Sequence, residues 1–210
     1  MLAGKKILLA VTGSIAAYKA ALIVRLFVKE KSEVRIIMTE NAKKFVPPPP
    51  LSTLSKHPVY SSFYKDNSEE WHNHVALGAW ADVLIIAPAS AQTLSKMAHG
   101  LCDNFLLSVF LSIKCPVYFA PAMDLDMLAH PATQKNIDIL VALGNHLIDS
   151  EVGELASGLN GKGRMAEPET IVGIIREAFN SRVFSSKKVL ITSGPTYESL
   201  DSVRFIGNHS

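Results

Sequence analysis

Short apolar runs, separated by stretches with helical spacing, recur along most of this chain. An apolar run without alternating polar residues predicts a strand that is buried on both of its faces. The four clearest runs are Ile7–Val11, Val34–Met38, Val83–Ala87 and Val117–Ala120, and His146–Ile148 is a shorter fifth candidate. Because helical stretches stand between the strands, we expect an α/β fold: a doubly wound, mostly parallel, Rossmann-like sheet in three α/β/α layers.

The helices expected around these strands span residues 15–29, 91–99, 104–111, 131–143 and 168–179. Two other segments do not fit the alternation. Val46–Pro50 contains four consecutive prolines, so we expect a stiff surface connection rather than a helix interior or a central strand. Ser150–Glu167 is rich in glycine and poor in large apolar residues, so we expect a long flexible loop.

Composition narrows the class of protein. Hydrophobic residues make up 48% of the chain and charged residues 19%, so a substantial core is expected. The net charge is +2 and there is no basic stripe, which argues against binding of nucleic acid. No apolar stretch reaches the roughly 18 residues that a membrane-spanning helix needs. Cys102 and Cys115 lack metal-binding spacing and fit a reducing cytosol, so we expect a cytoplasmic protein. His72 and His74 lack a third ligand, so no metal is expected.

Small and hydroxyl residues follow the predicted strands, at the sheet edge where doubly wound folds bind ligands. They are Thr12-Gly13-Ser14-Ile15, Thr39, Pro88-Ala89-Ser90 and Pro121-Ala122-Met123. Gly13 and Ser14 before a helix suit either a phosphate or an ordinary turn. A dinucleotide site would need further glycines and an acid in place of Thr39, so a mononucleotide such as FMN is favoured.

Three polar side chains are candidates for acid–base chemistry, each with an ordinary alternative. His74 is either an acid–base group or one of a solvated pair with His72 before a helix. Asp124 and Asp126 are either paired catalytic carboxylates or acids in the first turn of a helix. Residue type and spacing leave both choices open.

Five motifs in one order carry a resemblance over about residues 5–180. They are Gly13-Ser14-Ile15-Ala16-Ala17-Tyr18-Lys19, His74, Pro88-Ala89-Ser90-Ala91-Gln92-Thr93, Gly100-Leu101-Cys102-Asp103-Asn104 and Pro121-Ala122-Met123. This combination resembles the homo-oligomeric flavin-containing cysteine decarboxylases. The tail, from Ile191-Thr192-Ser193-Gly194-Pro195-Thr196 to Asn208-His209-Ser210, looks like the opening of phosphopantothenate–cysteine ligase.

The resemblance implies a function and a division into domains. A decarboxylase fused ahead of that ligase implies FMN-dependent decarboxylation of 4'-phosphopantothenoylcysteine to 4'-phosphopantetheine in coenzyme A biosynthesis. Residues 1–182 would form the decarboxylase and residues 187–210 a truncated start of the ligase, so ligase activity would need a longer chain. Family members are trimers or trimer-based shells, which implies a homo-oligomer with FMN and the histidine meeting at subunit interfaces.

The resemblance also implies roles for individual residues. His74 matches the catalytic histidine, and the segment around Ser157-Gly158 to Gly163-Arg164-Met165 matches a flap that closes over substrate, with Arg164 and Met165 as substrate contacts. The residues implied to hold FMN are Gly13, Ser14, Ile15, Thr39, Ser90, Thr93 and Met123.

Two positions depart from the family pattern. Asp124 replaces an asparagine that binds the substrate carboxylate, and an ionised aspartate would repel that group. Ser157 replaces a cysteine that donates a proton in the reductive step, and a hydroxyl is a much weaker acid than a thiol.

Three alternatives to decarboxylation of 4'-phosphopantothenoylcysteine stay open. They are oxidative decarboxylation of another cysteine conjugate, flavin prenyl transfer, and a non-catalytic role as a flavin-binding subunit.

Overall fold

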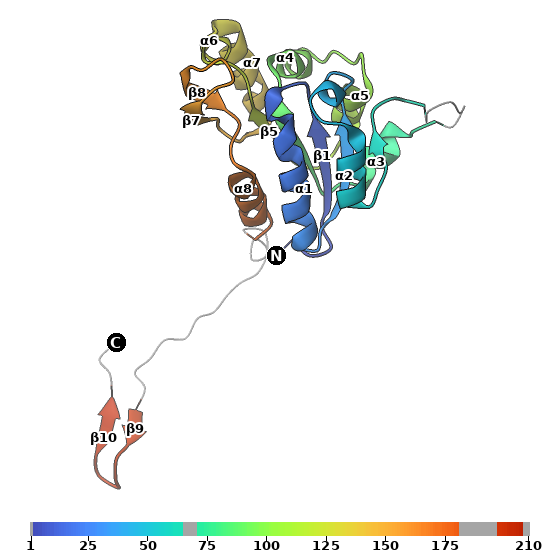
Figure 1. Cartoon of the computed structure of the whole chain (residues 1–210). Coiled ribbons are helices and arrows are strands. Elements are labelled where there is room, and N and C mark those ends of the chain that lie inside the picture. Colours follow the sequence, from blue (N-terminus) through green and yellow to red (C-terminus); the bar gives the residue numbers. More distant parts are fainter. Residues whose placement is uncertain (1, 65–70, 181–196, 208–210) are drawn as a thin grey trace.

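The computed structural model describes residues 2–64, 71–180 and 197–207 (Figure 1). Its centre is a six-stranded sheet in the order β3-β2-β1-β4-β5-β6, and every neighbouring pair is parallel. The strands are β1 (Lys6–Val11), β2 (Glu33–Met38), β3 (Val59–Tyr60), β4 (Val83–Ala89), β5 (Val117–Pro121) and β6 (His146–Leu147). Strand order reverses at β1, which lies between β2 and β4, and this confirms the expected doubly wound sheet.

Helices cover both faces of the sheet (Figure 1). They are η1 (Ile15–Lys19), α1 (Ala20–Lys29), η2 (Ala42–Lys44), α2 (Pro48–Ser55), α3 (His74–Trp80), α4 (Ala91–Ala98), α5 (Phe105–Ser112), α6 (Leu125–Ala129), α7 (Pro131–Ala142) and α8 (Pro168–Asn180). Ile7 and Leu9 of β1 pack toward α1, α2 and α8, whereas Leu8 and Ala10 pack toward α3, α4, α5 and α7. Both faces of β1 are therefore buried, as its apolar run predicts.

The proline run is not a surface connection, and that expectation was wrong. Pro47 is the N-cap of α2, and Pro48, Pro49 and Pro50 form its first turn. The first amide groups of a helix have no partner inside the helix, so prolines remove no hydrogen bond there. Leu51, directly after them, is fully buried.

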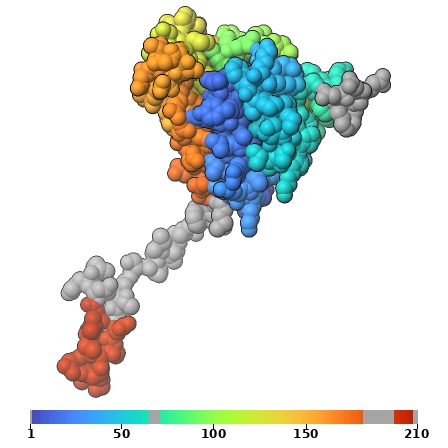
Figure 2. All heavy atoms as spheres, viewed as in Figure 1, coloured from blue at the N-terminus to red at the C-terminus, as the bar shows by residue number. Residues whose placement is uncertain are grey.

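The glycine-rich segment is not a structureless loop, and that expectation was also wrong. Within residues 150–167, β7 (Glu151–Glu154) and β8 (Asn160–Arg164) form an antiparallel hairpin. A Cβ on Gly163 would lie 2.4 Å from the Met123 carbonyl oxygen, and one on Gly161 would lie 2.9 Å from Leu125. These glycines thus allow close packing on the turn after β5 rather than flexibility. In the space-filling view the hairpin (orange) lies beside α6 (yellow) (Figure 2).

The C-terminal part of the described chain is a separate small hairpin of β9 (Tyr197–Ser199) and β10 (Phe205–Gly207). Asp201 accepts hydrogen bonds from the backbone amides of Val203 and Arg204, at 2.9 and 2.8 Å. Residues 181–196 lie outside the described residues, and with them the expected boundary between the two domains and the motif Ile191-Thr192-Ser193-Gly194-Pro195-Thr196. No helix in the described ranges has the length and apolar character to cross a bilayer.

Candidate functional site

A buried hydroxyl ties together the carboxyl ends of the two central strands. Thr12 Oγ1 donates to the Pro88 carbonyl oxygen at 2.7 Å and accepts from the Ser90 backbone amide at 2.9 Å. Thr12 is fully buried, so both bonds lie away from solvent, where an unmade hydrogen bond is costly. The turns that follow β1 and β4 are therefore held in fixed relation to one another.

The turn after β1 approaches two neighbouring segments closely. A Cβ on Gly13 would lie only 2.7 Å from the Asn41 Cβ, so this position has no room for a side chain. Ser14 is the N-cap of η1, accepting from the Ala16 amide at 3.3 Å, and its hydroxyl lies 3.5 Å from the Ala122 carbonyl oxygen. Gly13 and Ser14 thus bring the ends of β1, β2 and β5 together.

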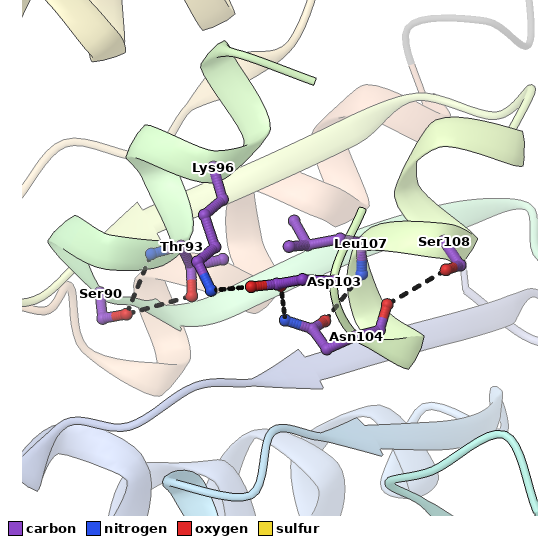
Figure 3. Close-up of polar contacts among 7 residues, drawn as sticks. All are labelled: Ser90, Thr93, Lys96, Asp103, Asn104, Leu107 and Ser108. Carbon is purple, nitrogen blue, oxygen red and sulfur yellow. Dashed lines mark hydrogen bonds and ion pairs between the residues drawn. The ribbon is translucent and has the colours of Figure 1, made fainter. Parts of the chain in front are cut away.

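A row of polar side chains follows β4 and leads toward α5 (Figure 3). Ser90 caps α4 by accepting from the Thr93 amide at 3.4 Å, and the two hydroxyls are 3.1 Å apart. Lys96 pairs with Asp103, which accepts from the Asn104 side-chain amide at 3.0 Å (Figure 3). The row therefore offers both hydroxyl groups and a paired charge to the space beside it.

Two adjoining cavities open at this edge of the sheet, with volumes of about 570 and 270 Å³. Gly13 and Ser90 line both of them. Among the predicted site residues, the larger cavity is lined by Ser14, Ile15, Met123, Asp124, Arg164 and Met165, and the smaller one by Thr39 and Thr93. The larger volume lies in the range of small-molecule sites, and the pair lies where doubly wound sheets bind ligands.

The β7–β8 hairpin supplies one wall of the larger cavity and is tied to the body at its base. Met123 N donates to the Gly163 carbonyl oxygen at 3.2 Å. Glu151 Oε1 accepts from the Glu167 amide at 3.1 Å and from the Thr170 hydroxyl at 3.2 Å, which joins β7 to the start of α8. The base of the hairpin is therefore fixed, whereas residues 156–160 at its tip are exposed.

Asp124 lies in the wall of the larger cavity, as the N-cap of the short helix α6. Its carboxylate makes no side-chain capping bond, and no other hydrogen bond or ion pair engages it within the described ranges. Asp126, two residues further on, is a first-turn acid of α6 and is exposed. The two carboxylates are thus not a matched pair in one cavity.

His74 lies outside both cavities of its own chain. It is the first residue of α3, and its ring packs edge-on against Phe63 and Trp71 at centroid distances of 6.0 and 6.4 Å. Its Nδ1 is buried and has no hydrogen-bond partner in the described part of the chain. A single protomer therefore does not bring His74 together with the other predicted site residues.

Ser157 is exposed in the turn between β7 and β8, where Gly158 has a φ of +81°. Its neighbour Ala156 lines the larger cavity, but Ser157 itself does not. The structure therefore places the predicted proton donor at the mouth of the site rather than in its wall.

Several charged residues of the site were not singled out from sequence. Lys19 and Glu154 line the larger cavity, and Lys96 and Asp103 line the smaller one. Lys19 had a signal that could have found it, because it is a lysine within the small and apolar residues Ala16, Ala17, Ala20 and Ile23. A charge at such a position is expected to have a buried partner.

Comparison with models of known protein families shows to which family the chain belongs. Residues 1–180 match the family model described as Flavoprotein. The chain belongs to the flavoprotein family. Residues 184–210 match the model of the DNA/pantothenate metabolism flavoprotein C-terminal domain. Within the flavoprotein family, the chain falls among the flavin-dependent decarboxylases of cysteine conjugates.

Two curated relatives of this flavoprotein are informative. A cysteine/cysteine sulfinic acid decarboxylase from an unknown prokaryotic organism is 51% identical over 79% of this chain and 47% of its own length. The coenzyme A biosynthesis bifunctional protein CoaBC of Bacillus subtilis (strain 168) is 40% identical over 100% of this chain and 52% of its own length. The chain thus spans about half the length of these relatives and is homologous to the decarboxylase half of CoaBC.

Two solved structures share the fold over most of the flavoprotein region. A PPC decarboxylase mutant complexed with pantothenoylaminoethenethiol is 36% identical, with a TM-score of 0.74 over 84% of this chain and 99% of the other. The FMN-dependent cysteine decarboxylase SpaF is 30% identical, with a TM-score of 0.72 over 85% of this chain and 99% of the other.

Proposed function

We propose that this flavoprotein catalyses the FMN-dependent decarboxylation of 4'-phosphopantothenoylcysteine to 4'-phosphopantetheine in coenzyme A biosynthesis. The observation that carries the proposal is the pair of adjoining cavities at the strand ends, which share Gly13 and Ser90. Homology to the decarboxylase half of CoaBC supports this substrate over other cysteine conjugates.

The residues around the cavities fit FMN. Gly13 leaves space for close backbone approach, and the hydroxyls of Ser14, Ser90, Thr39 and Thr93 are suited to hydrogen bonds with a phosphate and a ribityl chain. Ile15 and Met123 supply apolar surface for a flat ring. Bound FMN would supply the oxidation of the substrate thiol that makes loss of carbon dioxide possible, and the later reduction.

The protein's own contribution is to bind the substrate, exclude water and supply a proton. Arg164 and Met165, in the hairpin wall, are the proposed substrate contacts, and Asp124 faces the same cavity. Closure of the hairpin tip over the mouth would keep water from the reacting group. Ser157, next to Ala156, is the proposed proton donor. Its hydroxyl is a much weaker acid than the cysteine thiol found at this position in the family, since a free cysteine has a pKa of about 8.5.

A homo-oligomer, as a trimer or trimer-based assembly, belongs to the same proposal. His74 lies outside both cavities of its own chain and has an unpartnered buried Nδ1, so another protomer is needed for it to reach a site. Large apolar side chains are exposed on both of the surfaces that would meet. They are Ile15, Tyr18 and Leu22 beside the larger cavity, and Tyr64, Trp71 and Val75 near His74. Light scattering that gives the mass of a monomer for the FMN-loaded protein would refute the assembly.

A second candidate is decarboxylation of free cysteine or cysteine sulfinic acid. The observation that favours it is the unpartnered carboxylate of Asp124 in the larger cavity, which suits the ammonium group of a free amino acid. The relative named a cysteine/cysteine sulfinic acid decarboxylase, at 51% identity, points the same way.

The deciding experiment is to incubate the FMN-loaded protein with each substrate and to identify products by mass spectrometry. We expect 4'-phosphopantothenoylcysteine to lose the mass of carbon dioxide alone. Loss of carbon dioxide together with two hydrogens would mean that the reductive step fails. Turnover of cysteine or cysteine sulfinic acid without turnover of the conjugate would replace the proposal by the second candidate. Ligase activity is expected only from a chain with a complete ligase domain.

A further inference from the structure

A buried lysine in the wall of the larger cavity has no part in the function proposed above. Lys19, the last residue of η1, is only 3% exposed. Its Nζ donates to the Met165 carbonyl oxygen at 3.0 Å and lies 3.0 Å from Glu167 Oε1. An ammonium group is costly to bury without a partner, so these two contacts account for its position.

Glu167 is shared between two cations. Its Oε1 lies 3.0 Å from Lys19 Nζ and 2.6 Å from Arg164 Nη2. The hydrogen bond from Lys19 is the main cause that lowers the pKa of Glu167, and the positive charges of Lys19 and Arg164 lower it further. The carboxylate is therefore ionised at neutral pH. The cluster of Lys19, Glu167 and Arg164 therefore carries one negative charge and two positive charges.

Arg164 is held at the cavity by the shape of the hairpin. It lies opposite Glu151 in the β7–β8 ladder, and its side chain crosses Gly153. A Cβ on Gly153 would lie 3.2 Å from Arg164 Cδ and 3.4 Å from Nη1, so glycine makes room for this path. A guanidinium has five N–H donors, and in the described residues only Nη2 is engaged in a hydrogen bond.

We propose that Lys19 is a positioning residue: it neutralises Glu167, so that the positive charge of Arg164 is left to bind the anionic group of the substrate. The inference rests on the proposed function, because it takes the ligand of the larger cavity to be an anionic cysteine conjugate. Asp124, in the same wall, has the wrong charge for that task, which leaves Arg164 as the cation that receives a carboxylate or a phosphate.

The charge cluster can be tested by removing the lysine and then its partner. Lys19→Met leaves Glu167 to cancel Arg164, so we expect KM for 4'-phosphopantothenoylcysteine to rise about tenfold, with kcat within about twofold of the wild type. Lys19→Met/Glu167→Gln restores the single positive charge and is expected to bring KM back to within about threefold of the wild-type value. A purely structural lysine predicts the opposite, because the double variant would then be no better than the single one.

Arg176→Gln is the matched control, since Arg176 belongs to an exposed ion pair with Glu30 away from the cavities and should leave KM unchanged. The melting temperature and the visible absorbance of bound flavin show whether each variant is folded and loaded. If Lys19→Met alone does not fold, the double variant, which buries no unpaired charge, decides: a KM like that of Arg164→Met overturns the inference.

A second substrate separates the two sources of the anion. Pantothenoylcysteine lacks the phosphate, so an equal rise in KM for both substrates assigns Arg164 to the carboxylate, and a rise for the phosphorylated one alone assigns it to the phosphate. Equal KM in wild type and Lys19→Met for both substrates overturns the role of Lys19 and leaves the proposed function intact. Absence of turnover by the wild-type protein overturns the proposed function and this inference together.

Discussion

Among the proposed site residues of this flavoprotein, Ser157 has the side chain that is least suited to its proposed role, the donation of a proton. It is exposed at the hairpin tip, where a cysteine would be more acidic and equally free to move. With Ser157 as the proton donor, the reductive half of the reaction is expected to be the slow half. A weak acid in this position affects the return of a proton and not the loss of carbon dioxide.

Introduction of a thiol at position 157 should accelerate the reductive step. We expect Ser157→Cys to raise the ratio of fully reduced to oxidised decarboxylation product about tenfold, because a thiol is the better general acid. Mass spectrometry of the products measures that ratio. Ser202→Cys, in the exposed turn between β9 and β10, is the control for a new surface thiol. An unchanged product ratio in Ser157→Cys would remove residue 157 from the reductive step.

The two native cysteines should differ in reactivity. Burial raises the pKa of the Cys115 thiol to about 11, whereas Cys102 is exposed. At neutral pH we expect iodoacetamide to modify Cys102 at least about tenfold faster than Cys115, since the thiolate is the reactive form. Peptide mass spectrometry follows both sites.

The raised pKa of Cys115 in the folded state also affects the free energy of unfolding. The contribution of Cys115 to stability is full below the ordinary pKa of 9.0 and falls as pH rises toward 11.

At the scale of elements, sequence patterns predicted the buried strands well and the hairpin poorly. Continuous apolar runs identified β1, β2, β4 and β5, because a strand covered on both faces must be apolar throughout. The hairpin β7–β8 has a half-exposed and largely polar sequence with glycines, so neither alternation nor apolar length marked it. Gly161 and Gly163 pack closely on Leu125 and Met123, and these contacts form only when the chain folds.

The hairpin glycines make a prediction about stability. Gly163→Ala would place a Cβ 2.4 Å from the Met123 carbonyl oxygen, so we expect a loss of about 2 kcal/mol in the free energy of unfolding. Gly173→Ala, within α8, meets nothing within 4 Å and should instead stabilise the protein by about 0.5 to 1 kcal/mol. Urea denaturation of both variants provides the comparison. Equal effects would mean that the hairpin does not pack on the turn after β5 in solution.

For the whole molecule, the packing of the first and last helices of the α/β body brings charges from distant segments together. Arg176 of α8 pairs with Glu30 at the end of α1, and the hydrogen bond from Arg176 is the main cause that lowers the pKa of Glu30. A lowered carboxyl pKa stabilises the folded state above the ordinary value of 4.5, and this stabilisation is lost as pH falls through the lowered value.

The α1–α8 ion pair should therefore appear in the pH dependence of unfolding. We expect Arg176→Gln to lower the melting temperature slightly at neutral pH. The difference from the wild type should shrink as pH falls below 4.5 and disappear once pH is below the lowered pKa of Glu30. Calorimetry at several pH values measures it. Arg25→Gln, an exposed arginine of α1, serves as the comparison. A difference that persists at low pH would show that Arg176 acts through packing of its alkyl chain.

Patterns of neighbouring residues were enough to predict the class of fold, the ends of the strands and the hydroxyl residues that follow them. Those properties are local, because hydrophobic period and turn chemistry are written in neighbouring residues. Which charges meet in the site depends instead on contacts made when the chain folds. Lys19 and Met165 are separated by 146 positions, and no local pattern links them. The position of His74 outside its own cavities is likewise set by how α3 packs on the sheet, which depends on contacts between distant segments.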